Sequence, residues 1–441
     1  MDHLQPEAQT ASGSIVIPEN EGKAPFSASK QEIAAALLSF VLGWIYLRRI
    51  LIYTWFDNAV PTALTVFTLG FLALGEYLSR GRPRPRESWV WLGCTLVTAA
   101  AVALDRCNAL DERLCHGFAF LHLFAVWWLL SRCGVLHAGE SGRLLPLDAV
   151  NGFLIIPWKN IFLRARTLYF AFCASVRSRL PGRPKTRTLL WSAFVAVTAL
   201  GMLSLAMQLL CTADDGFSSL MESVTGAVSF RLSEDLAGEL IFIVLSLPVS
   251  AWLFGLLGGS LREDRARLNM RMLRLETGLK KLQGVPARLW QILLALFCAV
   301  YALFFAVQGG YLFGAFTRTL PEGFIVSAYA RRGFFELCKV MTVNFALLYL
   351  ARRTARDGGL PRALSALLLV ESLLLAVVAF SKLALYVDCF GFTPRRLQSL
   401  WLVCVLACGC VCALVALFTR KKVFRAWMIF GAVSLSLLCL Y

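Results

Sequence analysis

Residues 362–386 read RALSALLLVESLLLAVVAFSKLALY, a run of 25 residues interrupted by few charges, and this stretch decides the class of fold. About 20 apolar residues in a helix cross a hydrocarbon core of about 30 Å. A backbone inside lipid must satisfy its own hydrogen bonds, which a helix does within one segment. The stretch therefore predicts a transmembrane helix.

The rest of the chain repeats this pattern. Of its 441 residues 58% are hydrophobic and 16% are charged, and the mean hydropathy is +0.67, values that exclude an ordinary soluble domain. We predict an all-α, polytopic membrane helix bundle of about eleven transmembrane helices. The predicted spans are 32–54, 59–79, 89–104, 114–131, 189–211, 237–258, 289–315, 334–351, 362–386, 397–418 and 424–440, of which the short third span is the weakest.

The basic residues predict the topology. Of 44 Lys and Arg, 30 lie in the connections after even-numbered spans and 10 in those after odd-numbered spans. Basic connections stay in the cytoplasm, so the N-terminus is predicted to be cytoplasmic and Tyr441 external. Residues 1–31 are polar and are predicted to be a disordered cytoplasmic tail, and 32–441 the transmembrane domain. The net charge of +17 does not form a basic groove with interleaved aromatics, so no nucleic-acid partner is expected.

Two cytoplasmic connections are long enough to fold. Segment 145–182 mixes aromatic and aliphatic residues with Arg, as an interfacial helix on anionic lipid headgroups would; a regulatory docking surface is the alternative. Segment 260–284 carries an apolar stripe that includes Leu268 and predicts an amphipathic helix. It either packs on the protein's own inner face or binds a protein partner. The oligomeric state stays open.

Two motifs resemble a known family. They are VQGGYLFGAFTRTLPEGFIVSAYARRGFFELCKV at 307–340 and FSKLALYVDCFGFTPRRLQSLW at 380–401. The chain resembles an uncharacterised bacterial multi-pass membrane family, the domain-of-unknown-function 4173 type, over about residues 32–425. It departs from that pattern at Gly310 and Lys382. The resemblance implies a bacterial plasma membrane and a helical fold, and it implies no mechanism.

Charged side chains inside a bilayer are functional candidates, because burying one costs about 2.5–3.5 kcal/mol on insertion scales. Glu371 lies near the middle of the ninth span, at the depth of Asn344 on the eighth. We predict that Asn344 and Glu371 form a hydrogen bond, and that Lys339 and Lys382 bracket Glu336. Glu371 is either a proton-coupling acid or a structural acid that is neutral and hydrogen-bonded between helices.

A second candidate cluster lies at the outer helix ends. It consists of Tyr329, Arg331 and Arg332 before the eighth span and Asp388 after the ninth. The outer Arg residues oppose the charge rule, so they either pair with Asp388 and clamp the helix ends or bind an anion. Cys107 and Cys115 could form an external disulfide, which their spacing alone does not decide.

The remaining patterns include no motif that is typical of the active sites of soluble enzymes. Four cysteines crowd the tenth span, but they do not share one helix face, so no metal site is expected, and no motif indicates a cofactor. Three classes of function stay open: a small-molecule or ion carrier, a non-catalytic sensor, assembly or envelope-homeostasis component, and a membrane enzyme acting on lipid or glycan. An enzyme is the least favoured, and no catalytic residue is assigned.

Overall fold

The computed structural model describes residues 26–52, 60–104, 113–179, 234–317, 334–356, 361–419 and 423–441, except 138, 143 and ten positions between 265 and 282. Within these ranges the regular elements are helices, and one isolated β-bridge joins Val285 to Ala355. In chain order the elements are α1 (Lys30–Ile45), the π-helix η1 (Tyr46–Leu51), α2 (Val60–Leu78), α3 (Arg86–Ala103), α4 (Arg113–Cys133), α5 (Leu145–Val150), the π-helix η2 (Asn151–Ile155), α6 (Ile156–Lys159), α7 (Leu163–Arg179), α10 (Glu234–Arg262), α12 (Ala287–Thr317), α14 (Phe334–Thr354), α15 (Arg362–Phe390), α16 (Pro394–Phe418) and α17 (Val423–Leu438).

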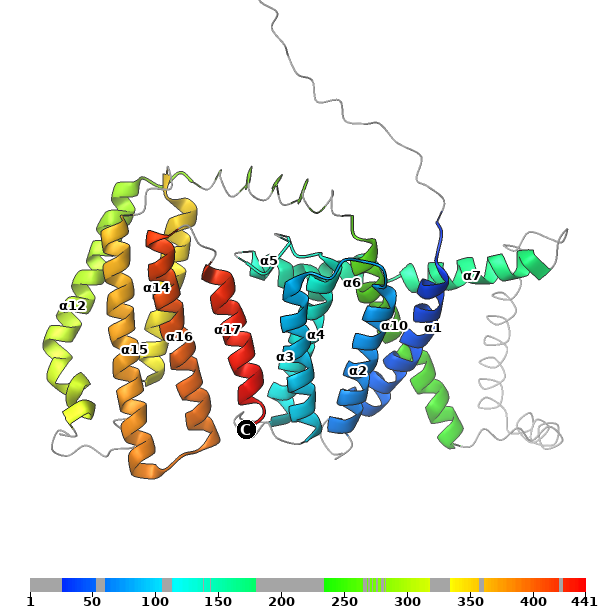
Figure 1. The fold of residues 1–441 in the computed structure, drawn as a ribbon, viewed down its shortest axis with the longest axis horizontal. Coiled ribbons are helices and arrows are strands. Elements are labelled where there is room, and N and C mark those ends of the chain that lie inside the picture. Colours follow the sequence, from blue (N-terminus) through cyan, green and yellow to red (C-terminus); the bar gives the residue numbers. More distant parts are fainter. Residues whose placement is uncertain are drawn as a thin grey trace, which may run out of the picture.

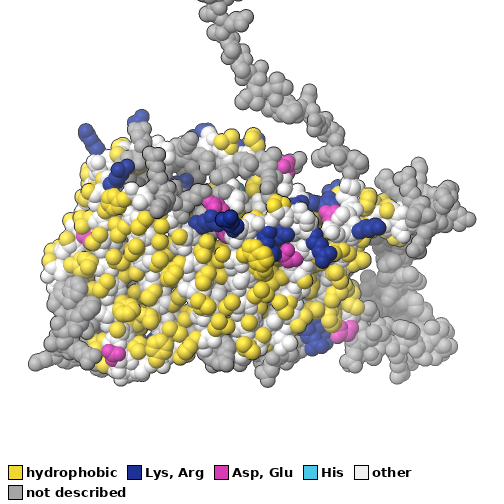
Figure 2. Space-filling model, viewed as in Figure 1, with side chains coloured by type: hydrophobic (Ala, Val, Ile, Leu, Met, Phe, Trp, Pro, Cys, Tyr) yellow, Lys and Arg dark blue, Asp and Glu magenta, His cyan; other side chains and the backbone are white. Residues whose placement is uncertain are grey.

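Seven helical segments in the described residues are long and apolar enough to cross a membrane. Gly117–Cys133 of α4 and Val423–Leu438 of α17 are shorter apolar helices, and α3 has 18 residues. These helices run side by side (Figure 1), and their outer surface forms a broad hydrophobic band (Figure 2). The protein is therefore a multi-pass membrane protein. The prediction of an all-α membrane bundle is confirmed for the described residues, and the total of eleven spans stays a prediction.

Two helix bundles lie next to each other (Figure 1). The first bundle contains α1, α2, α3, α4 and α10, and the second contains α12, α14, α15 and α16. We call the end of the molecule at which α1 begins the N-face, and the opposite end, where the chain terminates, the C-face (Figure 1). The connection between α2 and α3 lies at the N-face, and so do α5, α6 and α7.

The first bundle is fastened at both ends of the antiparallel pair α1 and α10. At the N-face, Arg262 Nε donates to Glu32 at 2.6 Å; at the C-face, Arg48 Nη2 donates to Glu239 at 3.0 Å. Between these pairs Gly43 lets the helices touch, because a Cβ there would lie 2.9 Å from the backbone nitrogen of Ser250. Close backbone approach at small residues is a common way for helices to associate in lipid.

Helix α17 joins the two bundles. Ala432, Leu435 and Leu438 belong to the hydrophobic core of the first bundle. On its other side, Trp427 Nε1 donates to the carbonyl of Val405 on α16 at 2.8 Å. At its N-terminal end Arg425 contacts the first bundle through an ion pair with Glu87 at 3.1 Å. The C-terminal helix therefore contacts both bundles.

The segment from α5 to α7 differs from the spans. Figure 1 shows α7 running across the direction of the membrane helices at the N-face. Its neighbourhood exposes large apolar side chains, with Trp158 61% and Phe162 76% exposed. The interfacial segment expected at 145–182, of which the structure describes residues up to 179, stays a prediction, and so does its contact with lipid headgroups.

The helix bounds agree with ten of the eleven predicted spans to within a few residues, and the fifth predicted span, 189–211, lies outside the described residues. Residues 1–25 and Cys107 also lie outside them, as does the side chain of Cys115, so the disorder of the tail and the disulfide stay predictions. In the predicted helix 260–284, Leu268 is buried, and the choice between packing on the inner face and binding a protein partner stays a prediction.

Candidate functional site

Polar side chains from three helices meet inside the second bundle. Tyr301 on α12 donates through its hydroxyl to Asn344 Oδ1 on α14 at 2.8 Å. Asn344 Nδ2 donates in turn to Ser372 Oγ on α15 at 2.9 Å, and Ser372 donates to the carbonyl of Leu368 at 2.7 Å. Asn344 and Ser372 are each 1% exposed. We call Cys298, Tyr301, Asn344, Glu371 and Ser372 the intramembrane polar cluster.

Glu371 supplies the only carboxyl group among the five residues of this cluster. It is 6% exposed, and the thiol of Cys298 on α12 faces its carboxyl group. Its Oε2 atom is buried and accepts no hydrogen bond from the described residues. No cation in the described part of the chain forms an ion pair with it. A negatively charged carboxylate is costly in this setting. The group is therefore expected either to hold a proton, which makes it neutral, or to bind another cation.

The predicted hydrogen bond between Asn344 and Glu371 is wrong. The Asn344 amide contacts Ser372 and Tyr301 instead. The predicted depth is correct to one residue, because Asn344 contacts α15 at position 372. Successive residues of a helix point about 100° apart, so depth alone could not choose between neighbouring side chains.

The structure separates the other three predicted intramembrane residues by exposure. Lys382 is 1% exposed, whereas Glu336 and Lys339 lie on the exposed side of α14. Glu371 and Lys382 are eleven residues apart on α15, which is about three turns and about 16 Å along one face of the helix. The predicted bracketing of Glu336 by the two lysines stays a prediction.

The outer helix-end cluster is described only in part. Tyr329, Arg331 and Arg332 lie outside the described residues, and Asp388 is exposed in the last turn of α15. Their pairing therefore stays a prediction. Among the described residues no three His, Cys, Asp or Glu side chains lie together in a way that could hold a metal ion.

A cavity of about 360 Å³ lies at the N-face of the first bundle. It is formed where the connection between α2 and α3 meets the ends of α4 and α10 and residue Leu268. The lining residues are Arg82, Pro83, Cys133, Gly134, Val135, Leu261, Glu263, Asp264 and Leu268. The volume falls within the range of small-molecule sites, and polar and apolar groups share the wall.

Two arginines beside this cavity share one carboxylate. Glu76, near the end of α2, forms an ion pair with Arg84 and a second one with Arg132 Nε at 3.2 Å. Arg132 is 6% exposed, and its Nη2 donates to the carbonyl of Ser79 at 3.0 Å. Burial lowers the pKa of Arg84, and the positive charge of Arg132 lowers it further. The three side chains carry one net positive charge.

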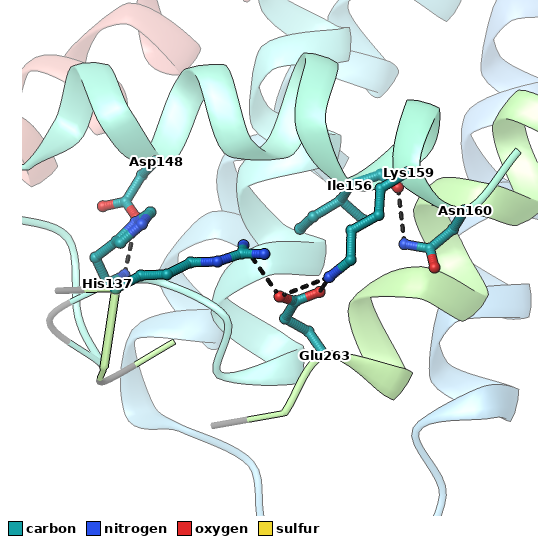
Figure 3. A network of polar contacts seen from close by, with 7 residues as sticks. His137, Asp148, Ile156, Lys159, Asn160 and Glu263 are labelled. Atoms are coloured by element: carbon teal, nitrogen blue, oxygen red, sulfur yellow. Dashed lines mark hydrogen bonds and ion pairs between the residues drawn. The ribbon is translucent and has the colours of Figure 1, made fainter. Parts of the chain in front are cut away.

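The acidic wall of the cavity is already neutralised in part. Figure 3 shows the Glu263 carboxylate facing the Lys159 ammonium group, whose Nζ lies 3.0 Å from Glu263 Oε2. Arg271 Nη1 lies 3.3 Å from the other carboxylate oxygen. Nearby, His137 donates its backbone N–H to Asp148 Oδ1 at 2.8 Å, and its Nδ1 lies 2.7 Å from the same oxygen.

Sequence reasoning missed the N-face cavity. The run RGRPRPR at 80–86, which the topology argument counts among the basic connections, supplies Arg82 and Arg84. Its acidic partner Glu76 and the buried Arg132 lie just inside the ends of apolar helices, where charge counting gives no information on pairing. Ionisable residues at such positions were the available signal, because isolated charges are rarely buried without partners.

A family model supplies the relationship of this chain. Residues 92–441 match the family described as domain of unknown function DUF4153. The match covers more than half of the chain, and the protein belongs to this family. The sequence resemblance pointed to the 4173 type, so the kind of family is confirmed and the particular family is wrong. The motifs behind that resemblance did not separate two families of helical membrane proteins. No curated protein and no solved structure matched the chain.

Proposed function

We propose that this member of the DUF4153 family is a carrier of a small molecule or ion, coupled to proton or cation exchange at the intramembrane polar cluster. We further propose that it crosses a bacterial plasma membrane eleven times with the N-face in the cytoplasm. The buried carboxyl of Glu371, with an unpartnered oxygen among neutral side chains, is the observation that carries the functional proposal.

The charge distribution supports the orientation. Lys and Arg side chains gather toward the N-face in Figure 2, and the four arginines between residues 80 and 86 belong to an N-face connection. Cytoplasmic connections carry the excess of basic residues in membrane proteins. The first described residues and the C-terminus lie at opposite faces, as an odd number of crossings requires (Figure 1).

The environment of Glu371 supports exchange. Its contacts from α12 and its neighbours on α14 and α15 are a thiol, a phenol, an amide and a hydroxyl, none of which carries a positive charge. Lys382, the buried cation on the same helix, lies about 16 Å away along the axis. The counter-charge of an ionised Glu371 would therefore come from the exchanged cation. A proton and a competing cation cannot both occupy the carboxyl group, and this exclusion is the basis of coupling.

An assembly role is the second candidate, because the segment between α10 and α12 exposes apolar side chains. Leu268 is 3% exposed and anchors this segment, while Met270 is 53% and Leu273 58% exposed. These two side chains would suit a protein partner at the N-face. In this alternative Glu371 is a structural acid that keeps its proton permanently.

A carbodiimide experiment separates the two roles. Dicyclohexylcarbodiimide enters lipid and modifies protonated carboxyl groups. For a carrier, we expect it to modify Glu371, as mass spectrometry of the peptide would detect, and we expect Na⁺, K⁺ or a high pH to protect the residue. Glu371→Gln serves as the control that must lose the modified peptide.

The outcomes are distinct. The extent of modification should depend on the cation and on the pH. If it stays the same with every cation and at every pH between about 6 and 9, the result would contradict exchange and favour the structural acid. Absence of modification in an otherwise folded protein over the same pH range would also contradict the proposal, because an exchanging carboxyl must at times be protonated and reachable.

A further inference from the structure

The wall of the N-face cavity combines one accessible arginine with a buried positive cluster. Arg82 lines the cavity, and its Nη2 donates to the carbonyl of Leu261 at 2.8 Å. Within the described residues this is its one side-chain hydrogen bond, so the remaining guanidinium nitrogens stay available. One bond to a helix-end carbonyl fixes the guanidinium against the wall and leaves it to face a ligand.

Behind Arg82 lie donors that have no partner. Arg132 Nη1 and Arg84 Nε are buried and form no hydrogen bond with the described residues. Arg82 belongs to this group by position, because its backbone N–H donates to the carbonyl of Ser79, which also accepts from Arg132. Buried donors without partners are uncommon in folded proteins. Arg84 and Arg132 adjoin the wall residues Pro83 and Cys133 in the chain, so their positive charge lies behind the wall of the cavity.

The charge of the site has a definite sign. Arg82, Arg84 and Arg132 stand against the single carboxylate of Glu76. Glu263 and Asp264 line the same cavity; Glu263 is paired with both Lys159 and Arg271, and Asp264 adds one negative charge. Summed over these eight side chains, the formal charge is positive by two. An anion is therefore favoured at the arginine side of the cavity.

The geometry points to a phosphate group as the ligand of this cavity, bound by Arg82 and held in the field of Arg84 and Arg132. Arginine binds phosphate with planar, paired donors, which suits an acceptor that presents several oxygens. The cavity lies at the ends of α2, α4 and α10, and Leu261 and Leu268 supply an apolar part of the wall. In a bilayer the ends of membrane-spanning helices lie at the level of the headgroups. The phosphate could belong to a lipid headgroup or to a soluble compound, and both present the same chemistry to Arg82.

The test measures binding of two probes to the full-length protein in detergent micelles at constant ionic strength. The probes are inorganic phosphate and dihexanoyl phosphatidic acid, a short-chain lipid with a phosphate headgroup, and the readout is the midpoint of thermal unfolding against probe concentration. Arg82→Gln removes the direct contact. Arg86→Gln is the matched control, because it removes an equal charge from the same connection at an exposed position outside the cavity wall.

We expect at least one probe to raise the unfolding midpoint of the wild-type protein, with affinity reduced about tenfold by Arg82→Gln and less than about twofold by Arg86→Gln. A response to both probes would identify a soluble phosphate compound as sufficient, and a response to the lipid alone would identify a headgroup site. Arg82→Lys should restore part of the affinity. The inference is overturned if neither probe binds, or if the two Gln variants weaken binding equally.

Discussion

The ion pair between Glu87 and Arg425 should hold α17 against the first bundle, and its strength can be measured. Glu87 is 4% exposed at the start of α3, and Arg425 Nε lies 3.1 Å from its Oε2. Glu87 also accepts hydrogen bonds from Trp91 Nε1 at 2.8 Å and from the backbone N–H of Ser141. Arg425 has a second acidic partner in Glu140.

The magnitude follows from these contacts. Two unit charges 3.1 Å apart attract by about 5 kcal/mol at an effective dielectric constant of about 20, and desolvation cancels much of this attraction. Glu87→Gln keeps an oxygen for Trp91 and Ser141 but leaves Arg425 with Glu140 alone. We expect it to lower the free energy of unfolding by about 2–3 kcal/mol, and Arg425→Gln by about 3 kcal/mol because it leaves a buried carboxylate uncompensated.

The assay is a double-mutant cycle, with the free energy of unfolding taken from SDS titration in mild detergent. The double variant should be less destabilised than the sum of the single variants by about 1–3 kcal/mol. Arg362→Gln, an exposed position at the start of α15, should give additive effects with Glu87→Gln. A coupling energy near zero for the Glu87 and Arg425 pair would refute the assignment of α17 to the first bundle through this contact.

Three further predictions test packing, the intramembrane cluster and the interfacial segment. Gly75→Ala should destabilise the protein by about 1–3 kcal/mol, because the new Cβ would lie 2.7 Å from an indole ring on α4. The new Cβ of Gly93→Ala meets nothing within 4 Å, so this variant should be more stable by up to about 1 kcal/mol. SDS titration of both variants measures the two changes in the free energy of unfolding. Asn344→Leu should cost about 1–2 kcal/mol in the same assay through its two interhelical hydrogen bonds, and an unchanged stability would contradict them. A nitroxide spin label in place of Phe162 should report headgroup depth by its accessibility to oxygen and to a water-soluble nickel complex; full exposure to the nickel complex would place the segment in water.

Most of the fold could be predicted from the sequence because lipid imposes a simple length rule. Ten of the predicted spans appear as helices within a few residues of their expected ends, including the short third span, which forms α3. Grouping into two bundles was not predictable in the same way. It depends on which faces of apolar helices pack together, and contacts such as that of Gly43 with Ser250 leave little trace in hydropathy.

The depth of the candidate site in the membrane could be predicted from the sequence, but the hydrogen-bond partners of its residues could not. Burial of Glu371, Asn344 and Lys382 follows from their places within long apolar runs. Predicting the partners of Asn344 requires the rotation of α15 about its axis. An error of one residue changes that rotation by about 100°. The N-face cavity needed the pairing of Glu76 with Arg132, residues 56 positions apart, which charge counting cannot give.

Water access to position 371 tests the carrier proposal most directly. With the 14 native cysteines replaced, Glu371→Cys and Val370→Cys are treated with a membrane-impermeant thiol reagent from each side of sealed vesicles. Val370 is 44% exposed on the outer surface of α15, so its cysteine faces lipid at nearly the same depth and should not react. A water-filled path predicts labelling of the cysteine at 371 from at least one side. Protection of both cysteines from both sides, in a protein that still folds, would contradict the carrier and leave Glu371 as a structural acid in a dry bundle.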